Sequence, residues 1–335
     1  MKTVVAKDKA VYLEESEIPK IKDQYILIKT KYSVISPGTE ISLIEASEGR
    51  TISLGYSAVG VAVEVGDGVK TISKGDLVAC YGSPYVKHAQ YLLVPKTLCC
   101  KVPSHVEPKA AALGGLGAIS IHALRIGQLQ FGEWAVVVGL GILGQLIAQI
   151  AHASLYRVIV HDVSEARASS FENLTGIPSL LTLQDVEQTI ETCTNHYGVD
   201  AVFLCASGKK SDLTHKSLGW IRDQGKVVIV GDLETNFPRA DMFAKEAKIL
   251  ISRAGGPGRY DPIFEKNAVD YPYGFVRWTE GRNLEEFIRI VSEKRINVSP
   301  YLQEIVELDE VEKAYKELIN KQSPVLTKVI KYPEE

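Results

Sequence analysis

The sequence predicts an α/β protein with two domains, a β-barrel and a doubly wound parallel sheet. Three features indicate this architecture. The first hundred residues read as short strands separated by glycine turns, residues 134–162 form a glycine-rich strand–turn–helix unit, and strands then alternate with helices. A chain of 335 residues is long enough for two domains, each with its own core.

The composition is that of an ordinary globular protein, with 45% hydrophobic and 24% charged residues. A net charge of −3 gives no electrostatic reason to expect a nucleic acid or a membrane as partner. The N-terminal stretch lacks the apolar core of a signal peptide, and five cysteines without framework spacing fit a reducing cytoplasm. We therefore expect a cytoplasmic protein whose partner is a small-molecule substrate.

The barrel is predicted from short apolar runs with turns between them. The expected strands are Tyr25–Val34, Tyr56–Val65, Leu77–Cys80 and Ala89–Val94. Asp67-Gly68 and Lys74-Gly75-Asp76 provide turn signals between them. Helices are then expected at Pro108–Leu113 and Ala118–Leu129, leading to the glycine-rich unit.

The glycine-rich unit begins with Trp134–Val138, a valine-rich run of the length of a buried parallel strand. The spacing Gly139-x-Gly141-x-x-Gly144 that follows is the fingerprint of a dinucleotide site. Gly139 permits a tight turn, Gly141 lets the backbone approach a pyrophosphate, and Gly144 lets the next helix sit close to the sheet. A turn of this kind without a ligand is the alternative interpretation.

The second strand of this unit is Arg157–His161, and Asp162 follows it directly. An acid at this position accepts hydrogen bonds from the ribose hydroxyls of NAD, whereas it repels the 2′-phosphate of NADP. The cofactor prediction is therefore NAD. Because no charged residue lies between Glu133 and Arg157, the stretch also resembles a membrane span, but its glycines and polar residues favour a strand, a turn and a packed helix.

Beyond Asp162 the alternation of helices and strands becomes regular. Ser164 is expected to cap a helix that contains Arg167. The further elements are helices at Asp185–Thr194 and Ser211–Trp220 and strands at Asp200–Cys205, Gly225–Val230 and Lys248–Ile251. The residues expected to bind the cofactor are Gly139, Leu140, Gly141, Ile142, Leu143, Gly144, Asp162, Arg167, Ala206, Ser207 and Gly231.

Regular structure is expected to stop between Gly255 and Trp278. Glycines, prolines, aromatic residues and arginines alternate there, which is typical of a functional loop. Arginine and aromatic side chains suit a hydroxylated or anionic substrate, so the predicted substrate-binding residues include Arg259, Tyr260, Arg277 and Trp278. A solvated loop held by aromatic anchors is the alternative. Amphipathic helices at Asn283–Ser292 and Leu308–Lys321 close the chain.

Motifs spread along the chain resemble one family. They are Gly55-Tyr56-Ser57-Ala58-Val59-Gly60, Val63-Glu64-Val65-Gly66-Asp67-Gly68-Val69, Gly75-Asp76-Leu77-Val78, Gly139 to Gly144 and Gly225-Lys226-Val227-Val228. Together with the order of barrel, fingerprint sheet and returning C-terminal segment, they resemble the medium-chain dehydrogenase/reductase superfamily. The resemblance implies a GroES-like catalytic domain (1–115 and 255–335) and a Rossmann domain (116–254).

Other stretches resemble the dehydrogenase half of bacterial bi-domain oxidoreductases. They are Ser36-Pro37-Gly38-Thr39-Glu40, Gly258-Arg259-Tyr260-Asp261-Pro262, Asp270-Tyr271-Pro272 and Val276-Arg277-Trp278-Thr279-Glu280. The second, sugar-dehydrogenase-like half of those proteins is expected to be absent, since the sequence stops at Glu335. Bacteriochlorophyllide dehydrogenases share part of the first stretch.

The zinc ligands of the superfamily are replaced in this sequence. Zinc alcohol dehydrogenases have Cys-Gly-Thr-Asp where this chain has Pro37-Gly38-Thr39-Glu40, and Gly-His-Glu where it has Gly55-Tyr56-Ser57. Around the third ligand position the chain reads Leu113-Gly114-Gly115-Leu116. Catalytic zinc needs about three ligands from Cys, His, Asp or Glu. We expect no zinc there, and no structural zinc either, because Cys80 and Cys99 frame no cysteine ladder.

Without zinc, side chains must stabilise charge on the substrate oxygen and carry its proton. The predicted catalytic residues are His88, Tyr56 and Glu40. His88 has an unperturbed pKa near 6.5 that suits proton transfer, and its alternative role is that of a surface strand histidine. Tyr56 occupies a lost ligand position and can donate a hydrogen bond or fill the vacated site, while Glu40 can orient a neighbour or cap a turn.

Polar residues near these positions complete the predicted substrate site. They are Ser36, Thr39 and Ser57. The predicted function is zinc-independent, NAD-dependent interconversion of a secondary alcohol and a ketone on a sugar, sugar acid or cyclitol. The alternatives are an enoyl or quinone reductase using NAD(P)H and a non-catalytic nucleotide-binding relic. By analogy with the family, we expect a homodimer or homotetramer.

Overall fold

The chain folds into two structural units, and the first contains both the N-terminal and the C-terminal parts of the sequence. The computed structural model describes residues 1–208, 212–320 and 325–333. Unit 1 comprises Met1–Ala118 and Ala254–Glu335, and unit 2 comprises Ile119–Arg253. The sequence places these divisions after residue 115 and before residue 255.

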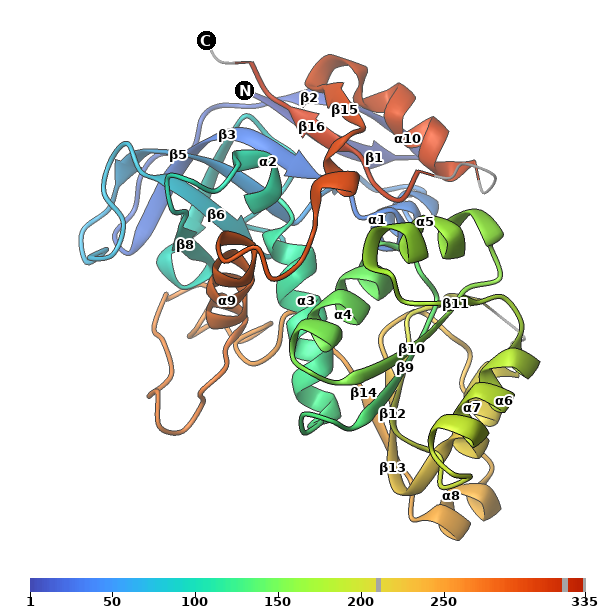
Figure 1. Ribbon diagram of the computed structural model, residues 1–335. Coiled ribbons are helices and arrows are strands. Elements are labelled where there is room, and N and C mark those ends of the chain that lie inside the picture. Colours follow the sequence, from blue (N-terminus) through green and yellow to red (C-terminus); the bar gives the residue numbers. More distant parts are fainter. Residues whose placement is uncertain (209–211, 321–324, 334–335) are drawn as a thin grey trace. The chain divides into compact units, whose positions relative to one another are not determined.

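Unit 1 contains the predicted barrel (Figure 1). Its strands are β1 (Lys2–Lys7), β2 (Ala10–Glu15), β3 (Tyr25–Val34), β4 (Ile52–Ser53), β5 (Ser57–Val65), β6 (Leu77–Tyr81), β7 (Tyr91–Pro95), β8 (Cys99–Lys101), β15 (Ile305–Glu307) and β16 (Val329–Lys331). A mixed sheet runs in the order β15-β16-β3-β5-β6-β8, with β7 also paired to β3, and a small antiparallel sheet runs β2-β1-β4. The predicted β-barrel domain is confirmed.

The long strand β3 organises unit 1, because it pairs with β5, β7 and β16. Ile26 and Ile28 of this strand are fully buried in a cluster with Val78 and Leu92. Complete burial of such a side chain contributes about 1.5–3 kcal/mol. This packing fixes the positions of the loops that leave β3, β5 and β6.

Helices flank the sheets of unit 1. They are α1 (Pro37–Glu45), α2 (Pro108–Ala111), α9 (Glu280–Ser292) and α10 (Val311–Ile319), and α3 (Gly114–Gly127) continues into unit 2. Helix α9 begins earlier than predicted because the Thr279 hydroxyl caps it, accepting a hydrogen bond from the Arg282 backbone N–H. Ser211 and Lys321, predicted as helix ends, lie outside the described residues.

Unit 2 contains a parallel sheet of the dinucleotide-binding type. Its strands are β9 (Trp134–Val138), β10 (Arg157–His161), β11 (Ser179–Leu180), β12 (Val199–Leu204), β13 (Ile221–Ile229) and β14 (Lys248–Ile251), in the order β11-β10-β9-β12-β13-β14. Its helices are α4 (Ile142–Ala153), α5 (Glu165–Thr175), α6 (Leu183–Cys193), α7 (Leu213–Trp220) and α8 (Arg239–Lys245). The strand order reverses between β9 and β12, which is where Rossmann folds bind ligands.

The uncharged stretch after Glu133 is a strand and a helix, as predicted. Helix α4 is buried along most of its length, including Leu146 and Ile147, which explains why it carries no charged residue. No helix in the described parts of the chain is long and apolar enough to cross a membrane.

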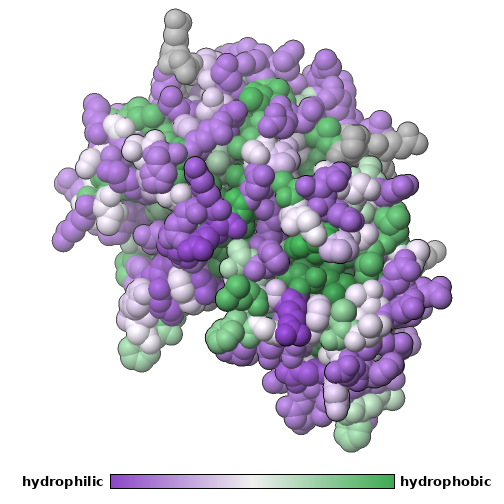
Figure 2. Space-filling model, viewed as in Figure 1, coloured by the Kyte–Doolittle hydropathy of each residue, from purple (hydrophilic) through white to green (hydrophobic). Residues whose placement is uncertain are grey.

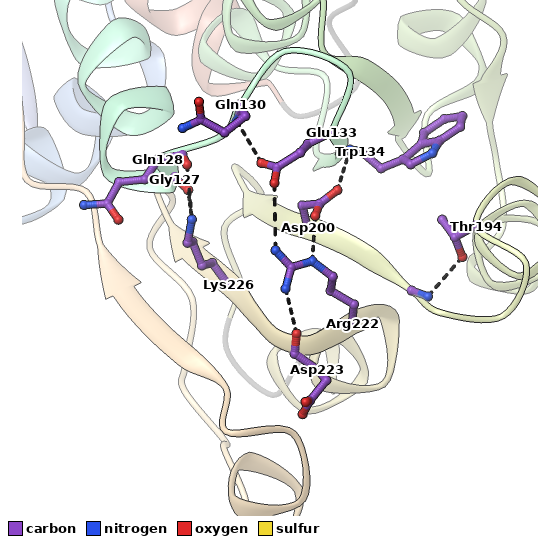
Figure 3. Close-up of polar contacts among 11 residues, drawn as sticks. Gly127, Gln128, Gln130, Glu133, Trp134, Thr194, Asp200, Arg222, Asp223 and Lys226 are labelled. Atoms are coloured by element: carbon purple, nitrogen blue, oxygen red, sulfur yellow. Dashed lines mark hydrogen bonds and ion pairs between the residues drawn. The ribbon is translucent and has the colours of Figure 1, made fainter.

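An ion-pair network ties together the starts of the unit 2 strands (Figure 3). The Asp200 carboxylate accepts hydrogen bonds from the Trp134 backbone N–H at 2.8 Å and from Arg222 Nε at 2.6 Å. Arg222 also lies 3.8 Å from Glu133, and Lys226 donates to the Gly127 carbonyl at 2.7 Å. The network joins strands at their amino ends, so it leaves the carboxyl ends free for a ligand.

The stretch between β14 and α9 forms turns, as predicted, and part of it extends outward as a loop. Figure 2 shows hydrophilic and hydrophobic areas on this face, and one small hydrophobic area lies at the lower left, where the outer end of this loop lies in Figure 1. Phe275 is 90% exposed and Tyr273 is 58% exposed. These rings therefore contribute little to the core.

Candidate functional site

The glycine-rich turn of unit 2 has the geometry that its spacing predicts. Gly139 has a φ of 95°, and its backbone N–H donates to the His161 carbonyl at 2.8 Å. A Cβ atom at Gly144 would lie 1.8 Å from the Gly139 carbonyl oxygen. Both positions therefore require glycine, the first for backbone conformation and the second for close approach of α4 to the turn.

Gly141 is the N-cap of α4, and a Cβ atom placed there would meet no atom within 4 Å. The first backbone N–H groups of the helix have no carbonyl partner within the helix and carry the positive end of its dipole. Open space at such a helix end suits a phosphate group.

The ends of four neighbouring strands meet at this turn. A Cβ atom at Gly139 would lie 2.8 Å from the Ala206 backbone nitrogen, and one at Gly231 would lie 2.0 Å from the Ala206 carbonyl. Ala206 follows β12, which adjoins β9 in the sheet, and Gly231 follows β13, which is the next strand beyond β12. Ser207 beside them is exposed. The structure thus brings these predicted cofactor residues together in a cradle that fits a dinucleotide.

Asp162 lies where the ribose of NAD is expected, and its carboxylate also fixes the backbone of the glycine-rich turn. One carboxylate oxygen accepts a hydrogen bond from the Leu140 N–H at 2.6 Å, and the other accepts from the Ser164 N–H at 2.8 Å. A carboxylate has further acceptor sites, so two backbone bonds do not exhaust it. Arg167 lies 4.0 Å from Asp162, and Ser164 caps α5 as predicted.

The remaining fingerprint residues face the protein rather than a ligand. Leu140 is fully buried, Ile142 is nearly so, and Leu143 is half-buried. Their side chains pack the turn and α4 in place. Any contact they make with a cofactor would therefore come from their backbone N–H groups.

In unit 1, the predicted catalytic residues Glu40 and His88 meet in the interior. Both side chains are fully buried, and His88 Nε2 lies 3.0 Å from Glu40 Oε2. Tyr315 donates a hydrogen bond to the same oxygen, and the Ser36 backbone N–H donates to Oε1 at 2.7 Å. The interpretation of His88 as a surface strand histidine is wrong, because Leu54 and Val4 bind its backbone inside the fold.

The second nitrogen of His88 is also engaged. Nδ1 lies 2.7 Å from the Ser33 hydroxyl, which lies 2.8 Å from the Tyr332 hydroxyl. Gly55, with a φ of 93°, permits this arrangement, since a Cβ atom there would lie 2.7 Å from the His88 ring. Because both ring nitrogens bind protein groups, His88 holds this buried network together.

Tyr56 lies where this network approaches the surface of unit 1. Its ring is half-buried, and its hydroxyl donates to the Ser36 hydroxyl at 2.6 Å and also bonds to Thr39. Burial raises the pKa of Tyr56; the Ser36 hydrogen bond lowers it, and the nearby Glu40 raises it again. The phenol therefore stays protonated and acts as a hydrogen-bond donor rather than a base.

The Ser57 side chain forms hydrogen bonds with backbone groups and does not line an open pocket. Its buried hydroxyl donates to the Ala112 carbonyl at 2.6 Å and accepts from the Gly115 N–H at 2.8 Å. These bonds join the start of β5 to the beginning of α3, so two of the three stretches where the family resemblance implies zinc ligands lie together, and they carry Tyr56, Ser57 and Gly115. Across the described residues, no three His, Cys, Asp or Glu side chains cluster closely enough to hold a metal ion. The donors do not fit zinc.

The four predicted substrate residues of the irregular segment fall into two groups. Arg259 is largely buried, donates to Glu265 at 2.5 Å and lies over the Tyr260 ring. Arg277 lies over the Trp278 ring at 3.6 Å and near the Tyr273 ring at 4.4 Å. The second group is an exposed cation–π cluster typical of a loop anchor. In the first group Arg259 lies in the interior of unit 1, whereas the Tyr260 ring is exposed.

Comparisons with known proteins agree with these two units. The sequence pattern of the zinc-binding dehydrogenase family matches residues 143–268. The probable D-xylulose reductase A of Aspergillus terreus is 24% identical over 92% of both chains. The alcohol dehydrogenase TADH from Thermus sp. ATN1 superposes with a TM-score of 0.81 at 19% identity, covering 99% of this chain and 100% of the other. Galactitol-1-phosphate dehydrogenase from Escherichia coli gives 0.79 at 18%, covering 98% and 99%.

Proposed function

We propose a zinc-independent, NAD(H)-dependent interconversion of a secondary alcohol and a ketone for this chain, which is an oxidoreductase of the medium-chain dehydrogenase/reductase superfamily. The proposed substrate class is a sugar, sugar acid or cyclitol, and the sugar and polyol names of two relatives support it. The observation that carries the proposal is the dinucleotide cradle of unit 2. In unit 1, the stretches where the family resemblance implies zinc ligands carry Ser36, Pro37, Tyr56 and Gly115 instead. The bi-domain motifs support the zinc-free branch.

NAD is the proposed nucleotide because of Asp162. Its carboxylate lies at the end of β10 with acceptor capacity left for ribose hydroxyls. A 2′-phosphate would meet its negative charge at close range. Arg167 lies 4.0 Å from that carboxylate, and its positive charge partly offsets the negative charge of Asp162. The preference for NAD over NADP therefore depends on both residues.

The chain's own residues supply the polar chemistry. When bound, NAD accepts the hydride. Tyr56 donates a hydrogen bond to the substrate oxygen, and Ser36 and Thr39 orient the phenol. Glu40 and His88 act indirectly. Glu40 accepts a hydrogen bond from the Ser36 backbone and so holds Ser36, and His88 in turn binds Glu40. We therefore assign Tyr56 to the substrate and His88 to positioning.

Two features support further proposals. The five cysteines, all within the described residues, are free thiols, which supports a reducing cytoplasmic location. Strand β14 lies at the edge of the unit 2 sheet with Ile251 71% exposed, which supports self-association through this edge.

The function is tested by assaying a panel of sugars, sugar acids and cyclitols with NAD, with and without a chelator. We expect turnover on this panel, no effect of the chelator and well under one zinc per chain by elemental analysis, because the donors cannot hold the metal. Stoichiometric zinc would contradict the metal-free mechanism. NADPH preference with quinone turnover would contradict the proposed reaction.

Asp162→Asn tests the cofactor assignment. The amide keeps the shape and an acceptor for the Leu140 N–H but removes the charge, so preference should shift toward NADP by about tenfold to a hundredfold. The measurement is the ratio of kcat/KM for NAD and NADP. Glu191→Gln, an exposed change in the same unit, should leave the ratio unaltered. An unchanged ratio in Asp162→Asn would remove Asp162 from the site.

A further inference from the structure

Glu280, the first residue of α9, is a buried acid without a hydrogen-bond donor. Its side chain is fully buried, and neither carboxyl oxygen has a hydrogen-bond partner among the described residues. Burying an ionised carboxylate in this way is costly, because it loses its hydration and gains no hydrogen bond in return. The group must therefore carry a proton or exchange one.

The group that faces Glu280 is a second acid. The carboxyl group of Glu265 lies against that of Glu280, and its side chain is only 9% exposed. Glu265 takes the available donors, since Arg259 donates to its Oε1 at 2.5 Å and the Tyr260 N–H donates to the same oxygen at 3.1 Å. One guanidinium thus serves two carboxyl groups.

The charges at this site favour one shared proton. Two adjacent carboxylates repel each other, and their contact becomes a hydrogen bond only when one of them is protonated. With one proton, the acid pair carries a single negative charge, which Arg259 balances. The other titratable groups that face Glu280 are Tyr81 and Tyr271. Burial raises the pKa of Glu280 to about 8, although Arg259 lowers it.

Tyr81 connects the acid pair with Tyr56. A Cβ atom at Gly255 would lie 3.2 Å from Tyr81 Cζ and 3.0 Å from Glu280 Cβ, so the two side chains flank the same point. The Tyr81 and Tyr56 rings pack edge to face, with ring centroids 5.9 Å apart. All of these residues belong to unit 1.

We propose that the Glu265–Glu280 pair accepts the proton released by alcohol oxidation, with Tyr81 as the intermediate group. This inference rests on the proposed function. The substrate C–H bond breaks and its hydride passes to NAD; the substrate O–H proton passes to Tyr81, which gives its own proton to the doubly ionised pair. The products are the ketone, NADH and a pair with one shared proton, and ketone reduction runs the same steps backward.

The pair fills a role that the other candidates cannot. Tyr56 keeps its proton, and both nitrogens of His88 are occupied within the buried network. Glu280 receives the proton through Tyr81 and does not itself touch the substrate. Its ionised form accepts the proton, so alcohol oxidation should rise and ketone reduction should fall as pH increases through about 8.

Glu280→Gln tests the proposal through the pH profile. The amide cannot take up a proton, so oxidation above about pH 8 should fall about a hundredfold and the inflection should disappear. NADH affinity should remain that of the wild type. Glu286→Gln, an ion-pair partner of Arg289 on the same helix, should keep the wild-type profile. A wild-type profile in Glu280→Gln would overturn the proposal.

Infrared spectroscopy without substrate separates this proposal from the proposed function. The wild type should show the C=O band of a protonated carboxylic acid at about pH 6.5 and lose it at about pH 9.5. A missing band would overturn the shared proton, whatever the substrate. The band without turnover on the panel would overturn the proposed function alone. If Glu280→Gln does not fold, Tyr81→Phe should show the band but lose the oxidation rate, and an undiminished rate would overturn the relay.

Discussion

Gly144→Ala should destabilise unit 2 and abolish measurable NADH binding. The new Cβ atom would lie 1.8 Å from the Gly139 carbonyl oxygen, a backbone atom held by the turn, so the strand and α4 must move apart. We expect a loss of about 3 kcal/mol in the free energy of unfolding and at least about a hundredfold loss in NADH affinity. Urea denaturation and fluorescence titration with NADH measure the two effects.

Gly141→Ala separates the ligand site from the fold. A Cβ atom there meets nothing within 4 Å, so the free energy of unfolding should fall by no more than about 1 kcal/mol, the cost of alanine at a helix N-cap. The same atom would occupy space proposed for the pyrophosphate, so NADH affinity should still fall about a hundredfold. Gly219→Ala, also in open space but within α7, serves as the control for both measurements. Wild-type affinity in Gly141→Ala would place the dinucleotide elsewhere.

Local chemistry explains where the fold was predictable. Strands β9 and β10 have the predicted bounds. Each is a run rich in β-branched residues, and the residues that follow, Gly139 and Asp162, belong to the glycine-rich turn. Strand β13 begins at Ile221 rather than at the predicted Gly225, since Gln224 and Gly225 read as a turn. Its early residues extend the strand through pairing of Ile221 with Val199 in β12, a contact that local sequence does not encode.

The candidate site was predictable only in part, for a related reason. Family positions point to Glu40, His88 and Tyr56, but the structural role of His88 depends on Ser33 and Tyr332, which lie 55 and 244 residues away along the chain. Burial and partner choice at such distances follow from the fold.

Other members of the site left only faint signals in the sequence. Tyr315 stands on the buried face of α10, where an aromatic residue reads as ordinary core. Glu280 was noted only as the end of a motif, although the Thr279 cap gave a signal that a helix begins there.

Glu40→Gln should cost about 3 kcal/mol of unfolding free energy, the second large effect expected in this protein. The carboxylate accepts hydrogen bonds on both oxygens, from the Ser36 N–H at 2.7 Å and from His88 and Tyr315. A glutamine offers one acceptor oxygen and one NH₂ group. In one orientation the NH₂ group faces the Ser36 N–H, which can only donate. In the other orientation it faces His88 and Tyr315, which must then rearrange to accept, so hydrogen bonds are lost in this buried site.

The same change should also disturb the orientation of Tyr56. Glu40 fixes the Ser36 backbone, and the Ser36 hydroxyl accepts a hydrogen bond from the Tyr56 hydroxyl. We expect kcat to fall with little change in NADH affinity, as the donor to the substrate oxygen loses its orientation. Glu45→Gln, an exposed change at the end of α1, should alter neither stability nor kcat. If Glu40→Gln unfolds at the same urea concentration as the wild type, the hydrogen bonds of the Glu40 carboxyl group do not stabilise the fold, and the prediction is contradicted.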